Sequence, residues 1–210
     1  MTMKLFMMMV CFSVMGFSQH LIPFASQNNT IELSVTNVAA LNAGKLSIAL
    51  VKLPDWLTVS KSSDDMVDLQ SGESKHVQFV FSVNKTAPVG KVEKLHVVIS
   101  SESGEQWTKD IAIQVAAPER YELFQNYPNP FNPATTISYQ LPVSSTVSLK
   151  VFDILGKEVA TLDEGIKEAG YYQQNWNAGG MASGMYLYQL SFQNQQGEME
   201  HYRKKLLLLK

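Results

Sequence analysis

The chain has 210 residues, of which 45 % are apolar and 17 % are charged, and its net charge is -2. This composition is too apolar and too weakly charged for an intrinsically disordered protein. The near-neutral charge also argues against a dedicated nucleic-acid binder, so we expect no nucleic-acid partner. At roughly 100–150 residues per domain, the length predicts one or two folded domains.

Residues 1–18 have the layout of a secretory signal peptide. A lysine near the start is followed by an uncharged apolar run over residues 5–17, and Ser18 is a small residue directly before Gln19. The run is shorter than the roughly 20 residues that a membrane-spanning helix needs. We therefore predict cleavage between Ser18 and Gln19, with a retained membrane anchor as the alternative.

The predicted cleavage also decides the cysteine chemistry of the chain. The single cysteine, Cys11, lies within the signal segment. The mature chain would then contain no thiol, no disulfide and no cysteine-ligated metal. An exported chain without disulfides has to be held together by packing alone.

Residues 19–117 show repeated alternation of apolar and polar residues, without a convincing helical pattern. Ile31, Leu33 and Val35 are one example, and turns that contain glycine or proline separate the runs. Such short strands with one apolar face are typical of an Ig-like antiparallel β-sandwich. We interpret Trp107 as a core-edge anchor, with a ligand platform as the alternative.

A second series of predicted strands follows a weakening of the alternation near residues 116–120. It extends to Lys210 and includes a predicted hairpin turn at residues 153–156, where Gly156 supplies a positive φ. The predicted fold class is therefore all-β, with two consecutive Ig-like antiparallel β-sandwich domains after the signal peptide. The predicted domain divisions are residues 1–18, 19–117, 118–133 for a linker and strap, and 121–210.

A proline-rich segment opens the second series. It consists of Asn126, Tyr127, Pro128, Asn129, Pro130, Phe131, Asn132 and Pro133. Proline fixes its own φ and favours an extended conformation in the preceding residue, and asparagine side chains close local turns. Two interpretations remain open: a rigid strap across a sandwich edge with Tyr127 and Phe131 buried, or a stiff interdomain linker of polyproline type.

The residues of the second series resemble a known family. Residues 121–125, the proline-rich segment and the Thr-Thr-Ile that follows it are similar to the C-terminal sorting domain of type IX secretion cargo. The same is true of residues 151–159, which include Gly156, of the stretch that contains Gly184 and Tyr186, and of the chain end. This Ig-like fold is also similar to a domain of flagellar hook-capping proteins, which leaves an assembly domain as an alternative.

The resemblance implies a route out of the cell. The chain would cross the inner membrane through the general export machinery and fold in the periplasm, where the type IX translocon would recognise the C-terminal domain. In this family the domain is commonly removed, and the cargo is released or attached to surface lipopolysaccharide. The implied location is the medium or the outer cell surface.

The chain end suggests how recognition works. Its residues are Lys204, Lys205, Leu206, Leu207, Leu208, Leu209 and Lys210. In a strand, two of the leucines would face the core and two would face outward, which makes an edge prone to pairing. We hypothesise that this edge is recognised by strand addition, with Arg203 and the three lysines setting register and preventing self-association. A strand covered on both faces is the alternative.

Residues 19–117 have a weaker resemblance to Ig-like accessory domains of bacterial surface proteins and glycosidases, carried by residues 53–57, 71–73 and 88–90. Such domains are spacers or binding modules. We therefore expect adhesion, carbohydrate binding or spacing, with a glycan or a protein as the ligand. A hydrolase accessory or a small polysaccharide-active protein is the alternative.

The sequence contains no recognisable catalytic constellation. None of the four histidines lies at metal-ligand spacing from another, and there is neither a nucleophile elbow nor a phosphate-binding loop. Asp64, Asp65 and Asp68 form a small acidic cluster, which we interpret as a solvated loop rather than a weak calcium site. We predict no catalytic residues, no metal, no cofactor and no enzymatic activity.

Overall fold

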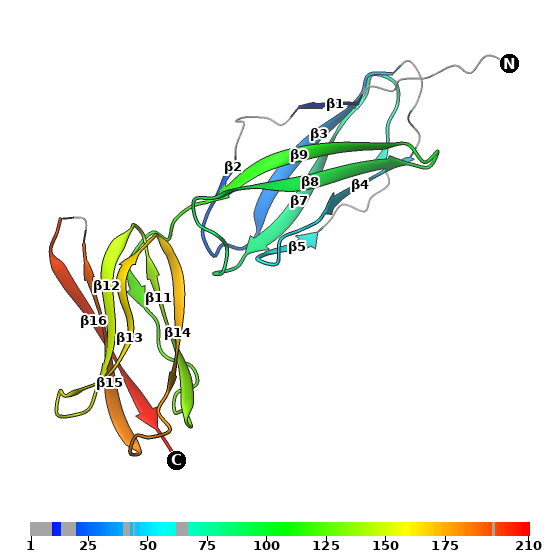
Figure 1. The fold of residues 1–210 in the computed structure, drawn as a ribbon. Helices are drawn as coiled ribbons and strands as arrows, with labels where there is room; N and C mark the ends of the chain where they lie inside the picture. Colours follow the sequence, from blue (N-terminus) through cyan, green and yellow to red (C-terminus); the bar gives the residue numbers. More distant parts are fainter. Residues whose placement is uncertain (1–9, 14–19, 40–42, 44, 62–66, 195) are drawn as a thin grey trace. The chain divides into compact units, whose positions relative to one another are not determined.

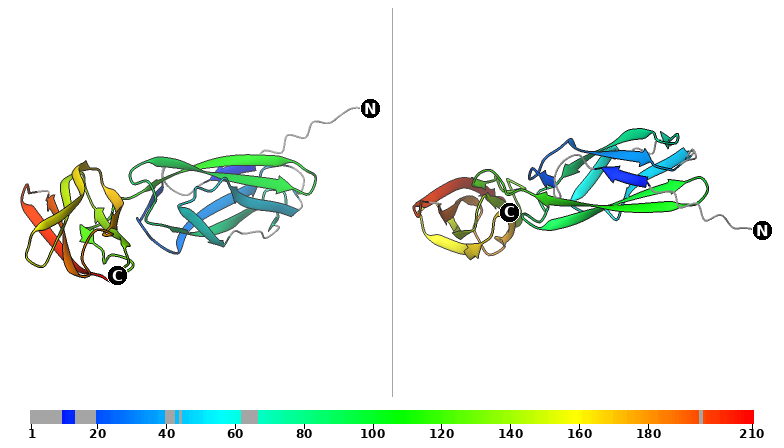
Figure 2. Two further views of the ribbon diagram at one scale, coloured as in Figure 1. Left: turned by 60° about the horizontal axis from the view of Figure 1, so that its bottom comes forward. Right: turned by 90° about the horizontal axis from the view of Figure 1, so that it is seen from above.

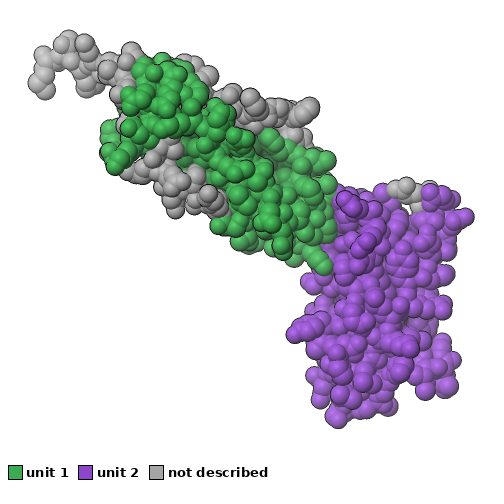
Figure 3. Space-filling model, turned by 180° about the vertical axis from the view of Figure 1, so that it is seen from behind, with its two compact units in different colours: residues 1–116 green, residues 117–210 purple. Residues whose placement is uncertain are grey.

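The computed structural model describes residues 10–13, 20–39, 43, 45–61, 67–194 and 196–210. The predicted cleavage pair Ser18 and Gln19, and two members of the acidic cluster, Asp64 and Asp65, lie outside these residues. Within them the chain forms strands and turns without a helix, so the predicted all-β class is confirmed. The chain separates into two compact units, residues 1–116 and 117–210 (Figure 3).

The first unit is a sandwich of two sheets (Figure 1). One sheet has the order β1 (Val10–Ser13), β3 (Asn29–Asn37), β7 (Ser74–Val83) and β5 (Leu57–Lys61). The other has the order β2 (His20–Ile22), β9 (Gln106–Val115), β8 (Val92–Ser101), β4 (Lys45–Val51) and β6 (Val67–Asp68).

Side chains from both sheets fill the core of the first unit. Leu33 in β3 and Phe79 in β7 are buried from one layer, and Ile48 in β4 and Ile99 in β8 are buried from the other. Since successive side chains of a strand point to opposite faces, the apolar alternation in the sequence produces this core directly. The named strands pair antiparallel except for the short β2, which runs parallel to β9, and Val89 forms an isolated parallel bridge to Val115.

β1 lies within the predicted signal segment and still pairs with the first unit. Its four residues run antiparallel to β3, with Val10 opposite Asn37 and Ser13 opposite Ser34. β1 thereby occupies the outer edge of that sheet. Cleavage before Gln19 would leave this part of β3 as an edge strand.

The second unit is also a two-layered sandwich (Figure 2). The smaller sheet has the order β10 (Glu122–Leu123), β11 (Ala134–Leu141) and β14 (Gly170–Asn177). The larger sheet has the order β13 (Glu158–Lys167), β12 (Ser145–Phe152), β15 (Gly184–Gln193) and β16 (Met199–Leu208). The turn between β12 and β13 contains Gly156 at a φ of 82°, as the sequence predicts.

A buried polar cluster joins the two sheets of the second unit where β13 meets β14. The Asp163 carboxylate accepts hydrogen bonds from the Tyr139 hydroxyl at 2.7 Å and from the Gln174 amide at 2.6 Å. Its other oxygen lies 2.7 Å from Lys167 Nζ. Burial raises the pKa of Asp163, but the hydrogen bonds from Lys167, Tyr139 and Gln174 outweigh it and hold the pKa below its ordinary value.

Candidate recognition surface along the C-terminal strand

β16 is the last strand of the chain and forms one edge of the larger sheet. Leu206 and Leu208 are buried, whereas Leu207 and Leu209 are 38 % and 49 % exposed. The two inward leucines pack into the core, and the other two point outward, as the strand alternation requires. The alternative of a strand covered on both faces therefore does not apply.

The proline-rich segment, which we call the strap (residues 126–133), lies along the end of β16. The Leu207 N–H donates to Asn129 Oδ1 at 2.9 Å, and the Phe131 N–H donates to the Leu207 carbonyl at 3.0 Å. The Leu209 N–H in turn donates to the Phe131 carbonyl at 3.0 Å. These bonds form a short parallel bridge in which the strap behaves like an added strand.

Gln125, the residue before the strap, extends this clamp. Its side-chain amide donates to the Lys205 carbonyl at 2.8 Å, and the Asn129 amide reaches the same carbonyl at 3.4 Å. The outward backbone groups from the Lys205 carbonyl to the Leu209 N–H are therefore already bonded. This corrects the hypothesis that the leucine stretch offers a free edge, because the strap occupies that edge.

Tyr188 in β15 holds the start of the strap through two hydrogen bonds. The Tyr188 hydroxyl donates to the Phe124 carbonyl at 2.7 Å and accepts the Asn126 N–H at 3.0 Å. The Asn126 side chain is buried and donates to the Pro128 carbonyl and to Thr135 Oγ1, each at 3.0 Å. Burial raises the pKa of Tyr188 to about 12, which favours the neutral hydroxyl that donates this bond.

The two aromatic residues of the strap have different environments. Phe131 is 2 % exposed, and its ring centroid lies 5.6 Å from that of Trp176. Tyr127 is 81 % exposed and joins the fold through backbone bonds to Thr136. The strap interpretation, in which both rings are buried, holds for Phe131 and fails for Tyr127, since the backbone pairing with Thr136 leaves the tyrosine ring outside.

The remaining predicted strap residues contribute backbone or surface positions. The Pro133 carbonyl accepts the Ala178 N–H at 2.9 Å, which joins the end of the strap to the end of β14. Pro130 and Asn132 are exposed. The peptide bonds before Pro128 and Pro130 are cis.

Gly184 and Tyr186, at the start of β15, lie beside the clamped end of β16. Gly184 pairs with Leu208 and has a φ of 151°, and Tyr186 pairs with Leu206. The Tyr186 hydroxyl donates to the Ala182 carbonyl at 2.8 Å. Gly156 lies elsewhere, in the β12–β13 hairpin at the opposite edge of the sheet.

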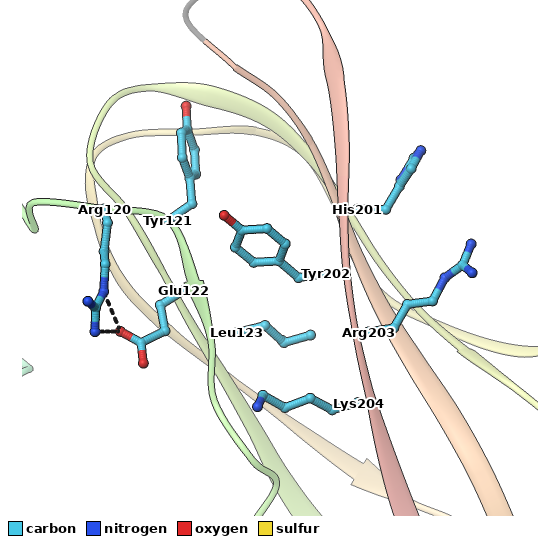
Figure 4. Close-up of a pocket in the computed structure, with 8 residues that line it drawn as sticks. All are labelled: Arg120, Tyr121, Glu122, Leu123, His201, Tyr202, Arg203 and Lys204. Atoms are coloured by element: carbon cyan, nitrogen blue, oxygen red, sulfur yellow. Dashed lines mark hydrogen bonds and ion pairs between the residues drawn. The ribbon is translucent and has the colours of Figure 1, made fainter.

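Beyond the strap, the two sheets leave a groove between β10 and β16. It has a volume of about 420 Å³ and is lined by residues 120–123 and 201–204 (Figure 4). Arg120 pairs with Glu122 at 3.2 Å on the β10 side. On the β16 side, Lys204 is half-buried and extends toward β10, whereas Lys205 and Lys210 are exposed.

Sequence reasoning missed the polar residues that hold the strap in place. Gln125 is far in sequence from the end of β16, and Tyr188 is far in sequence from the strap. Only the fold brings each residue to its partner. Tyr188 lies in a regular alternating run, which predicts its burial but gives no sign of the carbonyl that its hydroxyl contacts.

The histidines and Trp107 of the first unit show no site of comparable organisation. His76 pairs with Glu32 at 3.2 Å and His96 with Asp110 at 2.7 Å, both on the surface. Trp107 is partly buried and packs against the core. In the described parts of the chain, no cluster of three or more potential metal ligands occurs.

The same described residues also contain no helix with the length and apolar character to cross a membrane.

Comparison with known proteins identifies the second unit. The family described as "Secretion system C-terminal sorting domain" matches residues 125–205, which contain the strap and most of β16. No curated protein matches the chain.

Solved structures give weaker similarities. The chain is 14 % identical to dimeric latent PorU from Porphyromonas gingivalis, with 96 % of this chain and 20 % of that chain covered and a TM-score of 0.36. It is 8 % identical to the CupB2 chaperone from Pseudomonas aeruginosa, with 91 % and 99 % covered and a TM-score of 0.32. These values are too low to support an inference about function.

Proposed function

The C-terminal unit of this chain is a secretion system C-terminal sorting domain, and from this premise we propose that the unit is a handle for type IX secretion that carries the N-terminal sandwich to the cell surface. A sorting domain of this kind implies export to the cell surface or the medium and engagement with the type IX machinery. The observation that carries the proposal is the match over residues 125–205, which contains the strap and most of β16.

We assign the earlier steps of the route to the signal segment. The chain crosses the inner membrane through the general export machinery, loses residues 1–18 and folds in the periplasm. The translocon then recognises the folded C-terminal unit. After delivery, the unit is removed, and the passenger is released or attached to surface lipopolysaccharide.

The passenger is the N-terminal sandwich, to which we assign adhesion, carbohydrate binding or spacing and no catalytic step. A pull-down of the mature protein on insoluble glycans separates binding from spacing. Because Trp107 packs against the core, Trp107→Phe serves as the matched variant that keeps this packing while Trp107→Ala removes the ring. Turnover of a glycan that a carboxylate substitution abolishes would contradict the non-catalytic assignment.

Fractionation tests the handle directly. In a host with the type IX machinery, the full chain is expected at the surface or in the medium, and residues 1–117 alone are expected in the periplasm. A foreign passenger joined to the signal segment and residues 117–210 is expected at the surface, with the same passenger and signal segment alone as the control. Retention of the fused passenger in the periplasm would overturn the proposal.

Mass spectrometry of the surface form addresses the alternative assembly role. Loss of residues 121–210 from the delivered protein supports a handle that is removed. A delivered protein that keeps the whole unit would instead support a permanent assembly domain like that of flagellar hook-capping proteins.

A further inference from the structure

The first half of β16, from Met199 to Arg203, has backbone groups that point away from its partner strand β15. The strap bonds to the N–H and carbonyl of Leu207 and to the N–H of Leu209. The backbone N–H and carbonyl groups of the odd-numbered residues of β16 therefore point away from β15. Because this direction alternates along a strand, Arg203, His201 and Met199 present their N–H and carbonyl groups to the same side.

The segment from Met199 to Arg203 is an open edge. Within the described residues, the backbone pairing on that side of β16 is the single bridge between Phe131 and Leu208. β10 lies across the groove but pairs with β11 in the other sheet. The strap thus bonds to the end of this edge at Leu207 and Leu209 and leaves the backbone groups from Met199 to Arg203 without a bridge on that side.

Lys204 contributes a positive charge beside this edge. Its side chain is half-buried and points between the two sheets toward β10 (Figure 4), and it makes no hydrogen bond or ion pair with any described residue. The residue before it in β16 is Arg203, whose Nε donates to the Gln189 side chain. An ammonium that has no partner among the described residues can pair with an incoming carboxylate.

The groove holds little negative charge of its own to meet this ammonium. Its lining residues include one carboxylate, Glu122, and that group is already paired with Arg120. The carboxylate that the edge itself carries, Glu200, already accepts a hydrogen bond from the Asn194 side chain at 2.9 Å. The groove is therefore complementary to an acidic ligand rather than to a basic one.

We propose that the open edge of β16 from Met199 to Arg203 binds an extended, carboxylate-bearing segment of a partner protein as an added strand, with the carboxylate paired to Lys204. Backbone hydrogen bonds supply affinity in such strand addition, and the side-chain pair supplies specificity. The inference rests on the proposed function for the partner's role, which is a component of the export machinery.

An inward-pointing lysine on an edge strand also has a purely protective use, because it discourages edge-to-edge aggregation. This alternative makes a different prediction: protection requires no ligand, so the protein would bind no acidic strand at this edge. The binding experiment below separates the two.

The experiment uses the full mature chain and synthetic peptides of about eight residues that alternate threonine and valine. One peptide carries a central glutamate and the other carries glutamine, and fluorescence anisotropy measures both dissociation constants. We expect the glutamate peptide to bind about tenfold more tightly, and Lys204→Met to remove that preference. Equal binding of the two peptides by the unmodified chain, or no binding of either, would overturn the proposal.

A backbone variant tests strand addition independently of charge. Arg203→Pro removes an N–H that faces the open edge while leaving the ladder with β15 intact, and Arg203→Gln is its matched control for the lost charge. We expect Arg203→Pro to weaken the glutamate peptide about tenfold relative to Arg203→Gln. Hydrogen exchange on the unmodified chain provides a test without a variant, since the peptide must protect the Arg203 and His201 amides. Unchanged exchange there contradicts the inference.

Secretion of the fused passenger, compared with peptide binding by the chain, keeps the two proposals distinguishable. If the fused passenger reaches the surface but the chain shows no preference for the glutamate peptide, the sorting function stands and the acidic-strand site is wrong. If the peptide binds as expected but the fused passenger stays in the periplasm, the site stands as a binding edge and the proposed function is wrong.

Discussion

The Asn129 side chain accepts a hydrogen bond of 2.9 Å from the Leu207 backbone N–H, which lies 78 positions further along the chain. This contact joins the strap to the last strand of the C-terminal unit. Because the strap and β16 share one edge, a change in the strap alters the strand that closes the fold. The strap is therefore a part of the terminal edge and not a connector between the units.

Replacement of Asn129 by alanine should loosen the end of β16 without unfolding the unit. The substitution removes an exposed acceptor whose net contribution to stability is about 1 kcal/mol. We expect faster hydrogen exchange at the Leu207 and Leu209 amides. Asn132→Ala is the matched control, since Asn132 is an exposed strap residue that makes no such contact, and unchanged exchange in Asn129→Ala would refute the clamp.

The terminal leucines should differ sharply from one another. Leu206 is 1 % exposed and Leu207 is 38 % exposed, although they are adjacent. Leu206→Ala should lower the free energy of unfolding by about 2–5 kcal/mol, because it leaves a cavity in the core. Leu207→Ala should lower it by about 0.5 kcal/mol or less. Calorimetry of the full chain measures both, and similar losses in the two variants would contradict the observed register of β16.

The Asp163 cluster should make the second unit sensitive to acid. A carboxyl whose pKa is lower in the folded state than in the unfolded state stabilises the fold above its ordinary pKa of about 3.9, and that stabilisation is lost as the pH falls through the folded pKa. Asp163→Asn should lower the free energy of unfolding by about 2–3 kcal/mol at neutral pH.

The difference between Asp163→Asn and the unmodified chain should stay constant from about pH 7 to pH 5 and shrink below about pH 4. Denaturant unfolding across this range measures it. Glu164→Gln is the control, because Glu164 is exposed on the same strand. A difference that is independent of pH would show that the carboxylate charge does not stabilise the cluster.

The sequence predicted the architecture well because alternation is a local signal. Ile31, Leu33 and Val35 are buried as expected, since a strand that faces a core needs an apolar residue at every second position. The hairpin at Gly156 is equally local, because a positive φ favours glycine.

Contacts between distant segments were less accessible to sequence reasoning. Phe131 and Tyr127 are both aromatic residues next to proline, yet backbone pairing with Thr136 decides that only Phe131 enters the core. The sequence placed a free edge at the terminal leucines, and the structure fills it with the strap. Which backbone groups a strap covers depends on register between distant segments, for which a single sequence carries no signal.

The N-terminal processing of the chain should change the edge of the first sandwich. In the full chain, β1 pairs with β3 over residues 34–37. If export removes residues 1–18, mass spectrometry of the delivered protein should find Gln19 as its first residue. The outward-facing amides among residues 34–37 should then exchange faster than in the uncleaved chain, because they lose their hydrogen-bond partners in β1 and become exposed to solvent.

Amides of β7, which lies on the other side of β3, are the internal control. A delivered protein that begins before Val10, with protected amides over residues 34–37, would show that β1 is a permanent strand of the sandwich and that the signal-peptide prediction is wrong.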